Sequence, residues 1–195
     1  MTSDDDQERF YYSMLELANQ VKLNAETIKN QNILNIISLI VEIFEGEKRI
    51  FVYGAGRSGF IGRCFAQRLM HLGIKSCYVS DAVTYQYTNE DLLILISGSG
   101  ETTSTVAIAK KAKEIGGKII SLCANPKSNI AKLSDSIIEI KGKSKDKALT
   151  HESLAPYTSL FDVSALAVLD SIGGVLMKKL NITEEDINKR HASIE

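Results

Sequence analysis

Proline, cysteine and tryptophan are scarce in this chain of 195 residues, which holds two prolines, three cysteines and no tryptophan. The cysteines stand far apart, at positions 64, 77 and 123, and form no C-x-x-C pair. An odd number at such spacing disfavours both a disulfide framework and a structural zinc site. We therefore expect three buried, reduced thiols and a reducing compartment.

An excess of charge of either sign is also absent. With 23 basic and 24 acidic residues the formal net charge is −1, which gives no footprint for nucleic acid or an anionic membrane. No apolar stretch is expected to reach the roughly 20 residues of a membrane span. The acidic start, MTSDDDQERF, lacks the apolar core of a signal peptide. We expect a cytoplasmic protein whose ligand, if anionic, is held by local dipoles and a few cations.

What is present is a regular alternation of apolar segments. After six residues that we expect to be frayed, two helices are predicted at about residues 8–29 and 32–45. Short apolar runs predict five strands, at residues 49–53, 74–79, 92–96, 118–123 and 136–140. Helical patterns follow at about residues 58–72, 103–115, 129–133 and 159–180. Thr183 is expected to cap a last short helix.

This alternation predicts one α/β domain over residues 1–195. Strands that alternate with helices form a parallel sheet covered on both faces. We expect a three-layer, doubly wound sheet of five parallel strands in the order 2-1-3-4-5, with an N-terminal helical pair. In that order the connections after the first and third strands diverge and leave a crevice between them.

Two loops rich in glycine and serine follow the strands that flank this crevice. GAGRSG spans residues 54–59, and SGSGET spans residues 97–102. Glycines let the backbone approach a ligand closely, and the N–H groups at the start of the next helix can bind an anion. The pair predicts a site for a phosphorylated small molecule, although GAGRSG alone could be only a tight turn.

A dinucleotide site is the rival interpretation. GAGRSG fits the G-x-G-x-x-G pattern, and Asp81 lies near the end of the second strand, where an acid would bind the ribose. However, a dinucleotide fold does not require a second hydroxyl-rich loop, and this length leaves no room for a substrate domain. A small NAD-binding protein stays an alternative.

The combination of the two loops resembles the SIS (sugar isomerase) domain. Three segments extend the resemblance to the 6-phospho-3-hexuloisomerases: FVYGAGRSGFIGRCFAQRLMHLG, DLLILISGSGETTSTVAIAKKAKEIGGKII and INKRHASIE. The resemblance implies interconversion of 3-hexulose 6-phosphate and fructose 6-phosphate through a cis-enediol, with no cofactor and no metal. A non-catalytic sugar-phosphate-binding protein and an isomerase for another phosphosugar, such as arabinose 5-phosphate, stay as alternatives.

The resemblance also implies the residues of the binding site. Arg57 and Ser58 are expected to contact the sugar or its phosphate. The second loop is expected to hold the phosphate through side chains and backbone of Ser97, Gly98, Ser99, Gly100, Glu101 and Thr102.

The expected base lies in a segment where this chain departs from the family. The family's Gln-Pro-x-Gly-(Ser/Thr)-Leu-Phe-Glu reads APYTSLFD at residues 155–162, so Asp162 replaces the glutamate. Aspartate is one methylene shorter, and a displacement of about 1 Å can cost about a hundredfold in rate. Asp162 is the first candidate base and Glu152, ten residues earlier, is the second. A protein that binds a sugar phosphate with little isomerase activity is the third interpretation. His191 matches the family's tail histidine and is the candidate acid or base for the oxygens.

Assembly and partners are the last expectation. The helices predicted at about residues 32–45 and 159–180 are apolar nearly all round, more than one sheet sandwich needs. We expect a homo-oligomer joined through them, and the resemblance implies a tetramer in which His191 completes a neighbour's site. The expected ligand is a phosphorylated ketohexose, with no nucleic acid or membrane partner.

Overall fold

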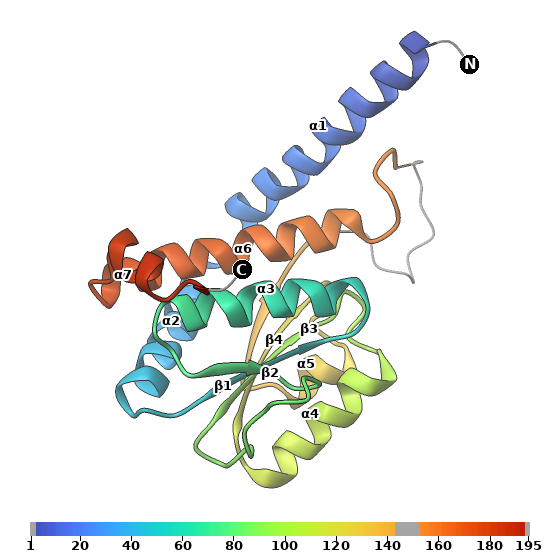
Figure 1. Ribbon diagram of the computed structural model, residues 1–195. Coiled ribbons are helices and arrows are strands. Elements are labelled where there is room, and N and C mark those ends of the chain that lie inside the picture. The colour runs from blue at the N-terminus through green and yellow to red at the C-terminus, as the bar shows by residue number, and fades with distance from the viewer. Residues whose placement is uncertain (1–2, 143–152, 194–195) are drawn as a thin grey trace.

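The computed structural model describes residues 3–142 and 153–193. Its centre is a parallel sheet (Figure 1). The strands are β1 (Ile50–Gly54), β2 (Ser76–Tyr78), β3 (Leu92–Ile96), β4 (Lys118–Cys123) and β5 (Ser136–Glu139). Their spatial order, β2-β1-β3-β4-β5, confirms the predicted topology. Gly54 pairs with Ile96, so β1 and β3 end side by side and their loops leave the same edge.

The strands are buried because helices cover both faces of the sheet (Figure 1). On one face lie α2 (Asn30–Glu45), α3 (Arg57–His71) and α6 (Ser159–Lys179). They pack on alternate strand residues such as Ile50 and Val52. On the other face lie α4 (Thr103–Ile115) and α5 (Asn129–Leu133), which pack on residues such as Phe51 and Leu93. The three predicted layers are therefore confirmed.

The chain begins and ends with helices outside these layers. The first, α1 (Ser3–Thr27), packs against α6, and its N-terminal half extends beyond the rest of the molecule (Figure 1). It starts five residues before the predicted helix, and residues 3–6, expected to be frayed, are helical. The last helix, α7 (Glu184–Lys189), is capped by Thr183 and Asp186 in a reciprocal capping box, which confirms the predicted cap.

The long helix α6 has two properties that matter for the fold. By length and composition it could cross a membrane, which was not expected from the sequence, but half of its most apolar window is buried within this structure. Phe161, Leu169 and Leu176 belong to the core on the α3 face of the sheet. A Cβ atom at Gly173 would lie 3.1 Å from Cγ of Arg68 in α3. This glycine therefore allows α3 and α6 to approach each other closely.

The three cysteines differ in their surroundings. Cys123 is buried, whereas Cys77 is half-buried and Cys64 is exposed on α3. The expectation of three buried thiols was wrong for Cys64, because its position in α3 faces away from the sheet. Burial raises the pKa of the Cys123 thiol, so this thiol stays protonated at neutral pH.

Candidate functional site

The two predicted loops line one cavity at the carboxyl edge of the sheet. It has a volume of about 320 Å³ and opens between the start of α3 and the start of α4. The third wall comes from the turn before α6 and from the first turn of that helix. The cavity is lined by Ala55, Gly56, Arg57, Ser58, Ile96, Ser97, Gly98, Ser99, Thr102, Tyr157, Thr158, Phe161 and Asp162.

The loop SGSGET uses its first hydroxyl to hold its own shape. Ser97 is 4% exposed, and its Oγ accepts a hydrogen bond from the Gly100 N–H at 3.2 Å. The same oxygen lies 3.4 Å from Oγ1 of Thr102, the N-cap residue of α4. Ser99 accepts from the Glu101 N–H at 3.2 Å. Ser99 and Thr102 thus line the cavity at a helix start, where free N–H groups favour an anion.

Two candidate residues of this loop lie outside the lining of the cavity described above. Gly100 has φ +70°, and a Cβ atom there would lie 2.1 Å from Oγ of Ser128, so only glycine fits. The Glu101 carboxylate accepts from the Asn129 N–H at 2.9 Å, at the start of α5. We expected both residues to bind substrate. In this structure their contacts brace the loop against α5, and their binding of substrate stays a prediction.

The loop GAGRSG forms the opposite wall. Gly56 has φ +58° and directly precedes α3, so Arg57 and Ser58 occupy the first turn of that helix. Gly54 and Gly59 serve packing instead. A Cβ atom at Gly54 would lie 2.6 Å from the Ser58 carbonyl oxygen, and one at Gly59 would lie 2.8 Å from that of Gly54.

The rival dinucleotide interpretation fails on the β2 side of this loop. Asp81 forms an ion pair with Arg63, whose guanidinium lies 4.1 Å from the centre of the Tyr78 ring. The Tyr78 hydroxyl donates to the Gly54 carbonyl oxygen and would lie 2.7 Å from a Cβ atom at Gly59. Tyr78 and Arg63 therefore pack between the glycines and Asp81, and the Asp81 carboxylate is engaged with Arg63, which disfavours a ribose site there.

Asp162 reaches the cavity, but its carboxylate is already bound. The side chain is 5% exposed. Its Oδ2 accepts from Nε of Arg57 at 2.7 Å and from Oγ1 of Thr158 at 2.7 Å. Its Oδ1 lies at the limit of hydrogen bonding, 3.5 Å from Oγ of Ser58. The structure thus joins Asp162 to both candidate residues of the first loop.

Sequence reasoning missed the roles of Thr158, Tyr157 and Phe161 in this wall. Thr158 has φ +67°, a backbone conformation that a β-branched residue rarely adopts, and it stands where the family pattern has glycine. That mismatch was the available signal. Tyr157 is 63% exposed at the cavity, and the Phe161 ring lies 3.3 Å from the Cβ position of Gly98.

A carboxylate on α1 fixes the segment that leads into this wall. Glu16 accepts hydrogen bonds from the Leu154 N–H at 2.9 Å, the Ala155 N–H at 2.8 Å and the Ser153 hydroxyl at 2.7 Å. These residues immediately precede the turn that carries Tyr157 and Thr158. No local pattern in the sequence could have revealed a contact across more than 130 residues.

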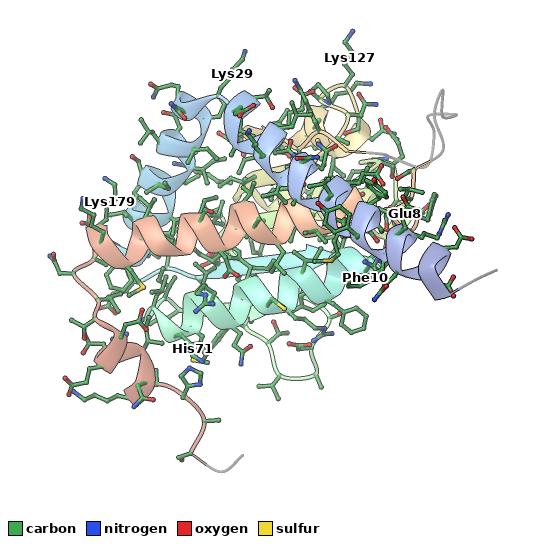
Figure 2. All side chains as sticks on the ribbon, turned by 90° about the horizontal axis from the view of Figure 1, so that it is seen from above. Glu8, Phe10, Lys29, His71, Lys127 and Lys179 are labelled. Atoms are coloured by element: carbon green, nitrogen blue, oxygen red, sulfur yellow. The ribbon has the colours of Figure 1, made fainter. Side chains whose placement is uncertain are left out.

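The histidine of the tail lies far from the cavity of its own chain. The ring of His191 packs on that of His71, with centroids 4.2 Å apart. His71 lies at the last turn of α3 (Figure 2). Arg57 occupies the first turn, and at about 1.5 Å rise per residue the two ends lie about 20 Å apart. Figure 1 likewise shows α7 at the opposite end of α6 from the cavity wall. Glu152, the second candidate base, lies outside the described residues.

We also searched the described residues for side chains that could bind a metal ion. Within residues 3–142 and 153–193, no group of three or more His, Cys, Asp or Glu side chains is placed to hold a metal ion.

Comparisons with known proteins extend these observations. A model of the SIS domain matches residues 43–167. The 3-hexulose-6-phosphate isomerase of Methanocaldococcus jannaschii is 39% identical over 178 residues, which cover 91% of this chain and 94% of that protein. The protein of the same name from Bacillus subtilis is 35% identical, with coverage of 92% and 96%. A crystal structure from Methanococcus jannaschii, from which a function as 3-hexulose-6-phosphate isomerase was inferred, superposes with a TM-score of 0.81. It is 36% identical, and the match covers 93% of this chain and 98% of that one.

Proposed function

The chain belongs to the SIS domain family, and from this premise we propose that it is a phosphosugar isomerase that interconverts 3-hexulose 6-phosphate and fructose 6-phosphate. The observation that carries the proposal is the cavity between the two loops, which offers hydroxyl groups on one wall and a guanidinium on the other. The relatives that bear the isomerase name over nearly the whole chain support the same reaction.

The size and polarity of the cavity suit a sugar monophosphate. Its volume of about 320 Å³ is at the lower end of the range for small-molecule sites, well matched to one phosphorylated sugar. We propose that Ser99 and Thr102, with the N–H groups at the start of α4, bind the phosphate. The sugar carbons would then extend across the cavity toward Arg57 and Ser58.

The reaction moves a ketone by one carbon. A base removes the proton from C2 of the 3-ketose, the electron pair forms the C2–C3 double bond, and the C3 oxygen becomes an enediolate oxyanion. A proton then returns to C3, and the proton of the C2 hydroxyl passes to the C3 oxygen, which leaves the ketone at C2. Atoms and electrons balance without a metal or a redox cofactor, and we propose that the enzyme uses neither.

Three groups stand as candidates for these proton transfers. Asp162 lies at the cavity, Glu152 belongs to the segment that leads to it, and His191 comes from the tail. General acid–base catalysis by such groups contributes about 10²–10⁴-fold to a rate. Since His191 lies about 20 Å from its own cavity by the length of α3, we propose that it serves the cavity of a neighbouring chain in a homotetramer.

The turnover assay tests the proposed reaction. Purified protein is mixed with 3-hexulose 6-phosphate, and fructose 6-phosphate is measured through a coupled dehydrogenase, with and without EDTA. We expect turnover that EDTA does not change. Turnover of arabinose 5-phosphate instead would replace the substrate, and binding of both sugars without turnover would establish the non-catalytic alternative.

The proposed reaction also places the protein in metabolism. Interconversion of these two hexulose phosphates belongs to the ribulose monophosphate pathway, and we propose a cytoplasmic enzyme of that pathway. A reaction that joins a one-carbon unit to a pentulose phosphate would supply the 3-hexulose 6-phosphate, and the reverse direction would make the pentulose phosphate.

A further inference from the structure

We propose that Asp162 is a positioning residue that, together with Thr158, orients the Arg57 guanidinium toward the enediolate oxygen, and that another group moves the proton. The inference rests on the proposed isomerase function. It assigns to Asp162 a role different from that of the base expected at this position.

The bonding of the Asp162 carboxylate is the first argument. A base must offer a free lone pair to the proton that it removes. Oδ2 accepts two bonds of 2.7 Å, from Arg57 and from Thr158, so both lone pairs of this oxygen are used, whereas Oδ1 has only a contact of 3.5 Å with Ser58. The side chain is 5% exposed, and its two short bonds tie the carboxylate to Arg57 and Thr158.

The orientation of Arg57 is the second argument. Its side chain is 63% exposed, and Asp162 binds it through Nε. The bond through Nε leaves the donors of both terminal nitrogens for a ligand at the cavity that Arg57 lines. A guanidinium that is fixed at one edge by a buried carboxylate loses little further freedom when substrate binds, which is how a preorganised donor stabilises developing charge.

The backbone of Thr158 is the third argument. Its φ of +67° lies in the left-handed region, which a β-branched residue rarely adopts. This conformation places Oγ1 within 2.7 Å of the Asp162 carboxylate. Glycine, which the family pattern has here, would relieve the strain but could not donate this bond. Thr158 and Asp162 therefore form one unit at the cavity wall, in which the hydroxyl holds the carboxylate against Arg57.

The charges agree with this role. In the proposed binding mode the phosphate faces the start of α4 and the sugar carbons lie toward Arg57 on the opposite wall. Negative charge develops there on the enediolate oxygen. Removal of one such donor costs about 10²–10³-fold in kcat in comparable sites.

A double-mutant cycle on Arg57 and Asp162 tests the inference. We expect Arg57→Ala to lower kcat about 10²-fold or more, and Asp162→Asn to lower it about tenfold to a hundredfold. The double variant should be no slower than Arg57→Ala within about threefold, because Asp162 acts through Arg57. The acidic limb of the pH profile of kcat/KM should persist in Asp162→Asn. Losses that multiply in the double variant, or loss of that limb, would overturn the inference.

Variants of Thr158 provide a second test that leaves both charges in place. Thr158→Val keeps the branched shape and removes the hydroxyl, whereas Thr158→Ser keeps the hydroxyl. We expect a kcat several-fold below wild type for valine and close to wild type for serine, with the two melting temperatures compared as a control for folding. Equal kcat in both variants would count against the proposed role.

Chemical rescue separates a positioning role from a merely structural one. Added guanidinium should restore part of the activity of Arg57→Ala but not of Arg57→Ala/Asp162→Asn, because the carboxylate holds the added cation. Equal rescue of both variants would contradict the inference.

Failure of the proposed function is recognised separately. If wild-type protein binds fructose 6-phosphate without turnover of any sugar, Kd for fructose 6-phosphate is measured for Arg57→Ala, Asp162→Asn and the double variant. Coupling between the two residues then supports the positioning of Arg57 by Asp162, although the isomerase function, and with it the enediolate role, has failed. Turnover with additive losses overturns the inference alone.

Discussion

The three hydroxyl residues of the loop SGSGET differ in what their side chains contact. All three line the cavity, but Ser97 is buried and its Oγ bonds within its own loop, whereas Ser99 and Thr102 are half-buried. A sequence motif treats these hydroxyls alike. Their burial separates one that shapes the loop from two that can reach a ligand.

The first prediction concerns these two residues. Ser99→Ala combined with Thr102→Val removes two donors that we propose for the phosphate, and hydrogen bonds to charged groups contribute about 1.5–3 kcal/mol each. We expect Kd for fructose 6-phosphate, measured by calorimetry, to rise at least tenfold. The control is Ser104→Ala. Ser104 is an exposed residue of α4, outside the cavity lining, and this variant should bind fructose 6-phosphate as wild type does. Unchanged affinity of the double variant would refute the phosphate assignment.

At the scale of elements, α1 and the cavity wall are linked through one side chain. Glu16 of α1 accepts hydrogen bonds from the backbone N–H groups of Leu154 and Ala155. These groups need an acceptor, and the residues that follow them carry Tyr157 and Thr158. Through these bonds α1, at the start of the sequence, supports the cavity wall that precedes α6.

The second prediction follows from this link. Glu16→Ala leaves two N–H groups without their charged acceptor, which we expect to cost about 1–3 kcal/mol of local stability. KM should rise several-fold as the wall loosens, and protease cleavage near residue 154 should become faster. Glu8→Ala, on an exposed turn of the same helix, serves as the matched control. Equal behaviour of the two variants would contradict the proposed support.

The third prediction concerns the junction of α4, β4 and β5. Burial alone would raise the pKa of Asp135, but hydrogen bonds from Lys113 and from the Ile119 N–H outweigh it and lower the pKa below its usual value. A lowered pKa in the folded state adds stability above the unfolded value of about 3.9, and this stability is lost as pH falls through the folded value. We expect Asp135→Asn to melt at a lower temperature than wild type at pH 7, with the difference shrinking toward pH 3. A difference independent of pH would show that the charge is not the cause.

At the scale of the whole molecule, the cavity and the tail lie at opposite ends of α3. The candidate residue His191 therefore cannot serve the cavity of its own chain in this structure. Exposed aromatic residues on α1 and α3 offer surfaces through which chains could associate, among them Phe10, Tyr11 and Phe60, which are 69%, 61% and 70% exposed.

The fourth prediction tests whether chains share their sites. If His191 reaches a neighbour's cavity, Arg57→Ala and His191→Ala should each be impaired alone, and co-expression of the two should restore activity, because some mixed sites carry both native residues. Light scattering should give a tetramer for wild type. A monomeric mass, or mixtures no more active than the better single variant, would exclude a shared site.

The sequence by itself determined the sheet and its order, because each strand is a short apolar run and each crossover a helix of the expected period. It also located both loops, since glycine and serine directly after a strand have few other uses. The three layers and the helix cap at Thr183 also followed from local sequence patterns.

Only the tertiary structure decided which of these residues face the cavity. The contacts of Asp162 with Arg57 and Thr158, of Glu101 with α5 and of Glu16 with residues 153–155 all join segments far apart in the chain or depend on a backbone angle. The structure likewise paired Asp81 with Arg63, which packs on the Tyr78 ring. Local patterns specify where the backbone turns, but the partner of a charged side chain is set by the packing of whole elements.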